Sequence, residues 1–342
     1  MSLRVGLIGS IGHIRYVLDG IPELEDVELV AAAKAIPEDD LTSVRKHEAF
    51  SDTTRFYEDW RKMLDEEKID IVTVCRPYPM NTEASIAALE RHIHVVSEKP
   101  VATSLESLAK LEEAVENSDA RMTAMMGMRF SPAFEAAKKA VDDGLIGKPA
   151  LATGQKSYKF GTRPEFFRQR ETYGGSILWV AVHAIDYVRW AAGVEYTQVA
   201  ALHGNLIKTE YPGCEDNGGI LFKLSNGGTG MVNLDYLRPS TSPTHGDDRL
   251  RIIGSDGVVE VTGCGEKAVL IQEGEAPRDL PLMEAKNFFV DFVEELRGEG
   301  THIIAPYEAT YVARICLLAR ESADRNEILP IPAPPAHAIS LR

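Results

Sequence analysis

Two glycines lie in the turn that follows the first apolar run of the chain. Gly9, Ser10, Ile11 and Gly12 come directly after the run 3–8, and apolar residues at helical spacing follow them. Glycines at a strand-to-helix turn let the backbone approach a pyrophosphate, and the free N–H groups of the helix face that anion. The full fingerprint also has glycine at the third and sixth positions, which are both isoleucine here. We therefore predict that these four residues bind a dinucleotide, with an ordinary strand–helix turn as the alternative.

Two cations stand at the ends of later apolar runs. An acidic side chain about 20 residues past the glycines usually binds the adenosine ribose 2′-hydroxyl, but Lys34 is found there. Because a cation suits a 2′-phosphate better, Lys34 slightly favours NADP over NAD as the cofactor; a solvated lysine at a strand end is the alternative. Arg76, followed by Pro77, ends the run 69–75. It could bind a cofactor phosphate, or it could pair with a carboxylate such as Glu98.

The tripeptide Glu98-Lys99-Pro100 follows the run 94–97, which we interpret as a strand ending at the same sheet edge as the glycine loop. A lysine at this edge could lie beside a nicotinamide ring. It could orient a substrate hydroxyl there and help its proton leave while hydride goes to the ring. A tripeptide this short also occurs by chance, so its position in the chain carries the prediction of a chemical role for Lys99.

The segments that must position these residues alternate between strand-like and helix-like patterns up to residue 127, which predicts βαβ units and a doubly wound parallel sheet. The runs are residues 3–8, 27–33, 69–75, 93–96 and 122–126, separated by helices that include 59–66, 82–91 and 104–117. Longer alternating stretches with hairpin turns then predict an α+β domain with a largely antiparallel sheet. We predict a cofactor domain over residues 1–127, a second domain over 128–330 and a Pro-rich tail over 331–342.

The composition excludes several function classes. The 342 residues include 52 acidic and 37 basic side chains, a net charge of −15. This excess repels a phosphate backbone and no basic stripe offsets it, so we predict no nucleic-acid partner. Four scattered cysteines without a CxxC pair predict a reduced, cytoplasmic protein without a metal site. No run reaches 18 apolar residues, which predicts no membrane partner. The motifs of serine hydrolases, zinc proteases and P-loop NTPases are missing from the sequence.

Taken together, these segments resemble the glucose-fructose oxidoreductase, inositol dehydrogenase and MocA family (Gfo/Idh/MocA). The resemblance covers nearly the whole chain and rests on RVGLIGS, AALERHIHVVSEKPVATSLE, MGMRFSPAFEAAK, GGSILWVAVHAID and LRIIGSDGVVEV. It implies a Rossmann domain followed by a substrate domain whose open sheet face commonly forms oligomers, here a homodimer or homotetramer. The implied chemistry is hydride transfer between NAD or NADP and a hydroxyl of a small sugar, polyol or cyclitol.

The resemblance also implies roles for individual residues. Glu98 falls on the family's glutamate near the nicotinamide ribose, Lys99 on its catalytic lysine, and His183 on the histidine that is a general acid or base in many members. Together with the residues found above, the cofactor contacts that we predict are Gly9, Ser10, Ile11, Gly12, Lys34, Arg76, Pro77, Glu98 and Lys99. The substrate contacts that we predict are Lys99, Arg129, Tyr158, Trp179 and His183. Cations between residues 156 and 170 would suit an acidic substrate such as a uronate, although a solvated basic loop explains any single one of them.

One departure from the family concerns the helix predicted near residues 175–192. The family usually has an aspartate four residues before the histidine, and Trp179 stands there. Helical spacing places Trp179, His183 and Asp186 on one face, so Asp186 could orient the imidazole. A core histidine bonded to Asp186 is the alternative. Trp179 also keeps two other functions open: a cofactor-binding sensor or pseudoenzyme, and a non-redox sugar enzyme that uses nicotinamide transiently.

Overall fold

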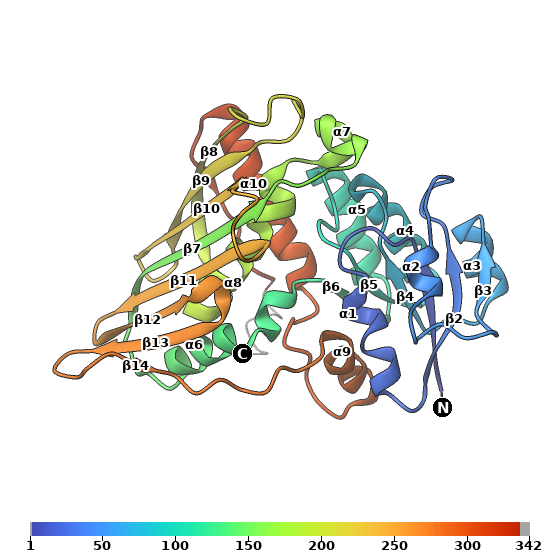
Figure 1. Ribbon diagram of the computed structural model, residues 1–342, viewed down its shortest axis with the longest axis horizontal. Helices are drawn as coiled ribbons and strands as arrows, with labels where there is room; N and C mark the ends of the chain where they lie inside the picture. Colours follow the sequence, from blue (N-terminus) through green and yellow to red (C-terminus); the bar gives the residue numbers. More distant parts are fainter. Residues whose placement is uncertain (1, 336–342) are drawn as a thin grey trace. The chain divides into compact units, whose positions relative to one another are not determined.

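The computed structural model describes residues 2–335 (Figure 1). The chain divides by compactness into two units. The first comprises the residues up to 127 together with 286–313, and the second comprises residues 128–285 together with the described residues from 314 onward. Residues 336–342 of the predicted tail lie outside the described residues.

The first unit contains a six-stranded sheet in the order β3-β2-β1-β4-β5-β6, and every neighbouring pair is parallel. Its strands are β1 Leu3–Ile8, β2 Val27–Ala33, β3 Arg55–Tyr57, β4 Ile71–Val74, β5 His94–Ser97 and β6 Met122–Ala124. This confirms the predicted doubly wound parallel sheet, to which the structure adds β3. The strand order reverses between β1 and β4, and in such sheets the crevice at that point binds ligands.

Helices cover both faces of this sheet, as the apolar strands require. All four residues of β4 are buried, because a parallel strand packed on both faces has no solvent-facing side. The helices of this unit are α1 Arg15–Leu18, α2 Thr42–Arg45, α3 Trp60–Glu66, α4 Asn81–Leu89, α5 Leu105–Glu116 and α9 Phe288–Arg297.

The helix α9 belongs to the first unit, whereas we predicted all of residues 128–330 as one second domain. Phe288 and Phe289 of α9 are buried, and the ring of Phe288 lies 5.8 Å from that of Tyr16. The segment after α9 is attached by His302, whose Nε2 lies 2.9 Å from the hydroxyl of Thr123. Residues 286–313 are therefore part of the first core because the apolar face of α9 is buried there.

The second unit is built on a nine-stranded sheet in the order β14-β13-β12-β11-β7-β10-β9-β8-β15. Only the β10–β7 pair is parallel among these described strands, which confirms the predicted, largely antiparallel sheet. The strands are β7 Pro149–Lys159, β8 Tyr196–Gly204, β9 Asn217–Leu224, β10 Thr229–Arg238, β11 Gly246–Gly254, β12 Gly257–Thr262, β13 Lys267–Gln272, β14 Arg278–Asp279 and β15 Leu329–Pro330. Ile331, which we placed in the tail, donates its N–H to the carbonyl of Thr197 at 2.9 Å.

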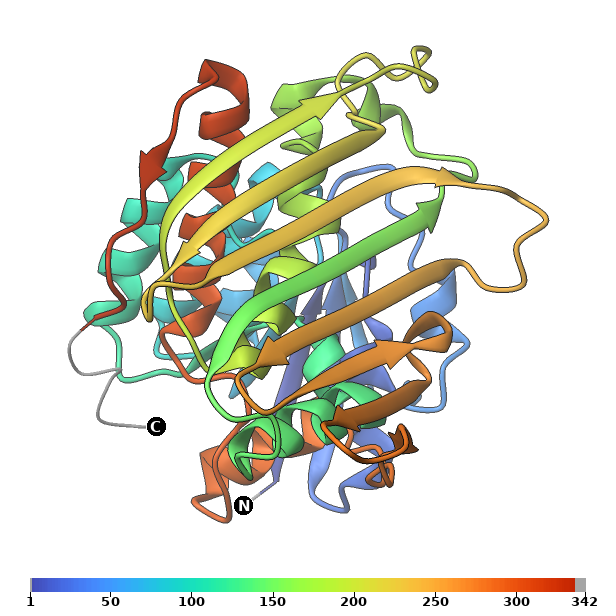
Figure 2. The ribbon, with the colours of Figure 1, turned by 90° about the vertical axis from the view of Figure 1, so that its left-hand side faces the viewer.

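One face of this sheet is covered by helices and the other is open. Figure 2 shows the strands toward the viewer and α8 behind them. Gly154 on β7 makes room for α8, because a Cβ there would lie 2.5 Å from Val188. Since side chains alternate along a strand, Lys156 and Tyr158 point to the same face as Gly154. The helices that belong wholly or partly to this unit are α6 Pro132–Asp142, α7 Arg170–Tyr173, α8 Val182–Ala192 and α10 Glu308–Arg325.

Candidate active site

The glycine loop lies at the carboxyl ends of β1 and β4. Gly9 has φ +78°, and a Cβ on it would lie 2.3 Å from the carbonyl oxygen of Cys75. Ile11 donates its N–H to the same oxygen at 3.1 Å. Gly12 has φ +88°, and a Cβ there would lie 2.6 Å from Cδ of Glu98. Both glycines are therefore required by their backbone conformation and by close approach. The glycine turn therefore packs tightly against the end of β4 and against Glu98.

Glu98 joins this loop to the turn that carries Lys99. Its side chain is fully buried, with Oε1 at 2.9 Å from Nδ1 of His13 and Oε2 accepting the His13 N–H at 3.0 Å. Burial, followed by the charge of Glu98, raises the pKa of the neighbouring Cys75 thiol well above its usual range. His13 is not among the predicted site residues, although its place directly after Gly12 is a usable signal. The predicted cofactor residues Gly12 and Glu98 are thus brought together through His13.

Lys99 is 2% exposed and lies in a turn that is held by the first residues of α4. Asn81 donates from Nδ2 to the carbonyls of Glu98 and Pro100, both at 3.2 Å, and its Oδ1 accepts the N–H of Arg76 at 3.0 Å. Thr82 donates its hydroxyl to the carbonyl of Val101 at 2.9 Å. The main chain on both sides of Lys99 is therefore fixed by two side chains that the sequence analysis did not predict as site residues.

The geometry of Arg76 argues against phosphate binding. Its guanidinium donates to the carbonyl of Met80 at 3.0 Å and to that of Ala35 at 3.3 and 3.4 Å. The carboxylate that it meets is Glu83, at 3.4 Å, and not Glu98 as we suggested. Burial lowers the pKa of Arg76. Arg76 therefore holds the ends of β2 and β4 together, and Pro77 continues the chain from it toward α4.

Lys34 stands at the end of β2, as predicted, beside a cavity of about 370 Å³. Its Nζ lies 2.8 Å from a carboxylate oxygen of the exposed Glu58. Asp39 also lines this cavity; it accepts the hydroxyl of Ser10 at 2.9 Å and the N–H of Ala35 at 3.0 Å. The carboxylates of Glu58 and Asp39 near this cavity oppose an additional phosphate there, which weakens the prediction of NADP.

The second unit carries His183, in a segment whose local geometry differs from our prediction. Residues 177–181, which include Trp179, form a π-helical segment, and α8 begins only at Val182. The prediction that Trp179 and His183 lie four residues apart on one regular α-helix is therefore wrong. Single π-helical turns occur often at functional sites. Trp179 and His183 are both buried in the second unit, at 7% and 2% exposure.

The spacing led us to expect that Asp186 could orient the imidazole of His183, and the contacts that the structure shows for its carboxylate are with Arg129. Both its oxygens accept hydrogen bonds from Arg129, from Nε at 3.0 Å and from Nη2 at 2.6 Å. Arg129 and Asp186 are each about 1% exposed at the side chain. The predicted substrate contact Arg129 is therefore engaged in a buried ion pair that anchors α8.

Tyr158, another predicted substrate contact, lies beside Lys156 on the face of the sheet that α8 covers. The Lys156 ammonium lies 4.9 Å from the centre of the Tyr158 ring and donates to Asp248 at 2.6 Å. Burial raises the pKa of Tyr158. The structure thus brings Tyr158 together with a buried lysine, a neighbour that the alternation along β7 could have indicated.

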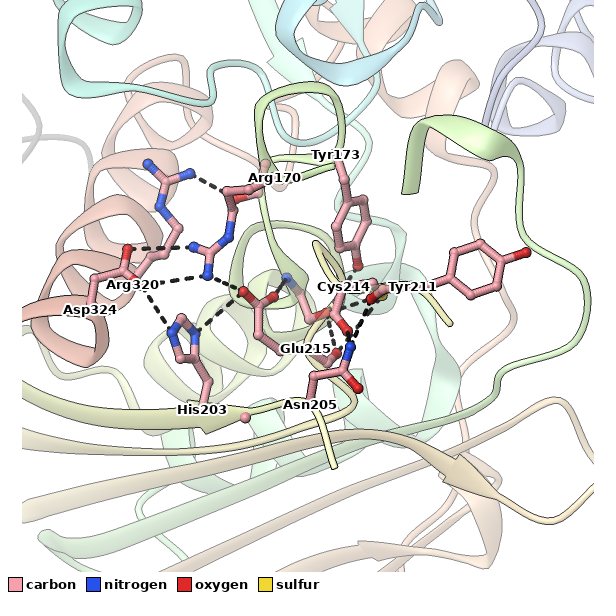
Figure 3. A network of polar contacts seen from close by, with 12 residues as sticks. Arg170, Tyr173, His203, Asn205, Tyr211, Cys214, Glu215, Arg320 and Asp324 are labelled. Atoms are coloured by element: carbon pink, nitrogen blue, oxygen red, sulfur yellow. Dashed lines mark hydrogen bonds and ion pairs between the residues drawn. The ribbon is translucent and has the colours of Figure 1, made fainter. Parts of the chain in front are cut away.

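A polar network fixes the chain that leads into the π-helical segment (Figure 3). Arg170 forms ion pairs with Glu215 and with Asp324, and His203 contributes Nε2 at 3.0 Å from Asp324. Glu215 accepts the N–H of Ser176 at 2.7 Å. These contacts connect α7, β8 and α10 to the residue that directly precedes the π-helical segment.

The predicted catalytic residues are divided between the two units. Lys99, with the glycine loop, lies on the first unit, and His183 with Tyr158 lies on the second. Within residues 2–335, no three His, Cys, Asp or Glu side chains are placed to hold a metal ion. None of the described helices is both long and apolar enough to span a membrane.

Comparison with known families and structures identifies relatives of both units. A family profile described as an oxidoreductase family with an NAD-binding Rossmann fold matches residues 3–126, and a GFO/IDH/MocA C-terminal domain profile matches residues 134–260. The myo-inositol 2-dehydrogenase of Thermotoga maritima is 24% identical over 279 residues, which are 81% of this chain and 80% of that protein. The scyllo-inositol 2-dehydrogenase of Bacillus subtilis is 25% identical over 78% of this chain and 79% of its own length.

Solved structures show the same fold over nearly the whole chain. A Thermotoga maritima structure described as an oxidoreductase is 38% identical, with a TM-score of 0.91 over 96% of this chain and 100% of that one. A levoglucosan dehydrogenase in complex with NADH and levoglucosan is 20% identical, with a TM-score of 0.83 over 97% of this chain and 100% of that one.

Proposed function

Because the chain belongs to the Gfo/Idh/MocA family of NAD-binding oxidoreductases, we propose that it transfers hydride between a nicotinamide dinucleotide and a hydroxyl of a small sugar, polyol or cyclitol. The observation that carries this proposal is the attachment of the Lys99 turn to the glycine loop through Glu98 and His13. The inositol dehydrogenases and the levoglucosan dehydrogenase among its relatives support this substrate class.

The residues of the first unit fit the cofactor. The turn that contains Gly9 and Gly12 packs directly against the carbonyl of Cys75 and the side chain of Glu98, and the loop around Ser10 and Ile11 would hold the pyrophosphate. Glu98 would lie near the nicotinamide ribose, and Lys34 would reach the adenosine ribose. When bound, the nicotinamide supplies the hydride acceptor.

Side chains of this protein would accept and transfer the proton of the substrate hydroxyl. Lys99 would orient the substrate hydroxyl and, as a neutral amine, accept its proton while hydride goes to the nicotinamide; Asn81 and Thr82 fix the main chain around it for this role. His183 would then relay this proton from Lys99 as a general acid or base. Tyr158 and Trp179 would contact the rest of the substrate, whereas Arg129 acts through Asp186 and the position of α8.

The test compares Lys99→Met with Lys110→Met, which removes an exposed lysine paired with Glu106 on α5. A panel of inositols, aldoses and anhydrosugars is assayed for formation of NADH. We expect Lys99→Met to lose about 100- to 10,000-fold in turnover while it still binds NADH, and Lys110→Met to behave as the original chain. Full activity of Lys99→Met would reject the proposed role.

A second candidate function is a sensor that binds the dinucleotide without turnover. The observation that favours it is Trp179, a buried indole on the π-helical segment, where the family resemblance leads us to expect an aspartate. Under this function NADH binds, yet no member of the panel yields NADH from NAD. Consumption of a sugar without a net change in NADH would instead indicate a non-redox enzyme that uses nicotinamide transiently.

The cofactor preference and the assembly are also proposals. Lys34 supports some preference for NADP, opposed by its ion pair with Glu58. The open face of the second sheet supports a homodimer or homotetramer. Leu221 and Met231 face each other across β9 and β10 and are 48% and 41% exposed, and a groove of about 880 Å³ includes both. Replacing Met231 by Glu should dissociate such an assembly, which sedimentation velocity would detect; an unchanged mass would reject this face.

A further inference from the structure

Arg163, in the segment that follows β7, is held over a platform of aromatic rings. Its Cζ lies 4.7 Å from the centre of the Tyr236 ring, 5.5 Å from that of Phe167 and 5.7 Å from that of Phe160. A guanidinium stacks well on aromatic faces. Three rings therefore fix the plane and position of this cation before any ligand arrives, which lowers the entropic cost of binding.

The guanidinium is not paired with a carboxylate anywhere in residues 2–335. Its one hydrogen bond runs from Nη2 to the carbonyl of Lys159 at 3.1 Å, and its buried Nε has no hydrogen-bond partner among the described residues. A guanidinium has five N–H donors, and a buried donor without a partner costs free energy. Four of the five N–H donors of Arg163 thus have no partner among the described residues.

The two next arginines along the chain show that this arrangement is specific to Arg163. Arg168 donates to Glu165 at 2.9 Å and to the carbonyl of Glu210. Arg170 forms ion pairs with Glu215 and Asp324. A solvated or structural basic loop explains these two residues, as the sequence analysis allowed, but it does not explain a cation seated on rings without a counter-charge.

The surroundings of Arg163 carry an excess of positive charge. Lys208 lies 5.3 Å from the centre of the Phe160 ring, on the same platform. Asp248, the carboxylate near Lys156, is already bonded to that lysine at 2.6 Å. Burial lowers the pKa of His245, and the charges of Arg163, Lys156 and Lys159 lower it further. This local cationic field contrasts with the net charge of −15 of the whole chain.

The platform is connected to the segment that carries Trp179 and His183. The hydroxyl of Tyr236, on which Arg163 stacks, lies 3.1 Å from that of Tyr173, and Tyr173 donates to Ser176 at 3.2 Å. Ser176 directly precedes the π-helical segment. Tyr158, a proposed substrate contact, has its ring 6.3 Å from that of Tyr236. The cation is therefore part of the same polar cluster as the substrate residues of the second unit.

We propose that Arg163 binds an anionic group of the substrate, so that this enzyme acts on an acidic sugar or polyol derivative and not on a neutral one. The proposal rests on the proposed function and names its substrate class. A carboxylate and a phosphate share the acceptor geometry that a guanidinium fork recognises. Lys159 and Lys208 supply the additional positive charge that attracts either anion.

The test compares three probes that share a pyranose ring: glucose, glucuronate and glucose 6-phosphate. Their binding to the full chain saturated with NADH is measured by calorimetry, and their oxidation is measured by formation of NADH from NAD. We expect one of the two anionic probes to bind at least about tenfold more tightly than glucose. The probe that does so identifies the anion as a carboxylate or a phosphate.

Two variants show whether Arg163 is responsible. Arg163→Gln should bring the favoured anion to within about twofold of glucose, while Arg163→Lys should retain part of the preference because it keeps the charge and loses the fork. Arg168→Gln, five residues along the same segment, is the matched control and should keep the full preference. Thermal unfolding of each variant reports whether the loop is still folded.

The outcomes separate this inference from the proposed function. Equal binding of all three probes to the original chain, or an anion preference that survives Arg163→Gln, overturns the inference. Oxidation of neutral inositols or glucose without an anion preference overturns the inference and leaves the proposed function intact. Tight binding of an anionic probe without any oxidation supports the inference and rejects the proposed function.

Discussion

The guanidinium donors of the buried arginines have different hydrogen-bond partners in the two units. In the first unit Arg76 donates to the carbonyls of Ala35 and Met80 and touches the exposed carboxylate of Glu83. In the second unit Arg129 is bonded through two nitrogens to the buried Asp186. The first arrangement ties two loops of the main chain together, whereas the second places two opposite charges where water does not screen them.

This difference matches what the two units are proposed to bind. Glu98 and Asp39, the charged side chains that contact the glycine loop, are bonded within the first unit. The loop itself offers backbone and glycine, which suits a cofactor common to the family. The second unit instead keeps Arg163 without a carboxylate partner among the described residues. Substrate specificity would thus be carried by a few side chains added to a shared fold.

The largest effect is expected for Arg129→Met. It leaves Asp186 as a buried, unpaired carboxylate, which costs about 3–5 kcal/mol in the free energy of unfolding. Arg76→Met should cost less, about 1–3 kcal/mol, because it leaves carbonyl groups without donors and frees only an exposed carboxylate. Chemical denaturation of both variants measures the two values. An equal loss of stability would contradict the difference between the two environments.

The next effect concerns Asn81, whose side chain holds the carbonyls on both sides of Lys99. Asn81→Ala should lower kcat by about 10- to 100-fold, because a small displacement of a catalytic group is costly, with a much smaller change in NADH affinity. Steady-state kinetics and NADH titration separate the two quantities.

If Asn81 had only a structural role, its replacement would affect folding and not the pH dependence of catalysis. In that case, Asn81→Ala lowers thermal stability and NADH affinity together, and the pH dependence of kcat stays unchanged. A positioning role predicts a shifted pH profile, because the environment of the Lys99 ammonium changes. Asn81→His supplies an imidazole N–H in place of the amide donor. This N–H can donate to the carbonyl of Glu98 or Pro100, so the variant should recover part of the lost kcat.

The contrast between the units also explains what the sequence could predict. The parallel strands follow from apolar runs, and the glycine loop from residues that need positive φ at Gly9 and Gly12; both are local requirements. The partner of Asp186 lies 57 positions away at Arg129, so local spacing along the chain does not indicate it. Such pairings are decided by tertiary packing.

The position of α9 was unpredictable for a similar reason. Its apolar face is evident from Phe288, Phe289 and Phe292, but an amphipathic helix can pack on either core. The π-helical segment at Trp179 likewise has no periodic signature of its own, since its residues are apolar on every side. Arg163 was visible as a cation, yet its platform of three rings comes from residues up to 73 positions away.

A smaller effect is expected for cofactor choice in the first unit. Glu58→Gln frees Lys34 from its ion pair and should raise the affinity for NADPH relative to NADH, and Lys34→Gln should lower that ratio. Each change should be no more than about fivefold, because exposed ion pairs contribute about 1 kcal/mol at most. Calorimetry with both dinucleotides measures the ratio, and Lys62→Gln, an exposed lysine paired with Glu66, is the control. An unchanged ratio in Lys34→Gln would rule out its role at the ribose.

The smallest effect tests whether residues 286–313 stabilise the first unit. Asp291 on α9 accepts the N–H of Ile303 at 2.9 Å, and its carboxylate contacts His302 and Lys286 at 2.7 and 2.5 Å. Burial opposes ionisation of this carboxyl, but the bonds to His302 and Lys286 outweigh it and lower the pKa of Asp291 below 3.8. A lowered pKa means that the ionised form is bound more tightly in the folded state than in the unfolded state.

The sign of the pH dependence follows from that shift. The stabilisation by Asp291 is complete above the unfolded pKa of about 3.9, and it is lost as the pH falls through the lower, folded pKa. Asp291→Asn should therefore lower the melting temperature at pH 7, and the difference from the original chain should shrink below about pH 4. Asp279→Asn, which removes an exposed carboxylate paired with Lys267 in the second unit, should show neither effect. A difference for Asp291→Asn that persists unchanged at pH 3 would show that its ionised carboxylate does not attach α9 to the first core.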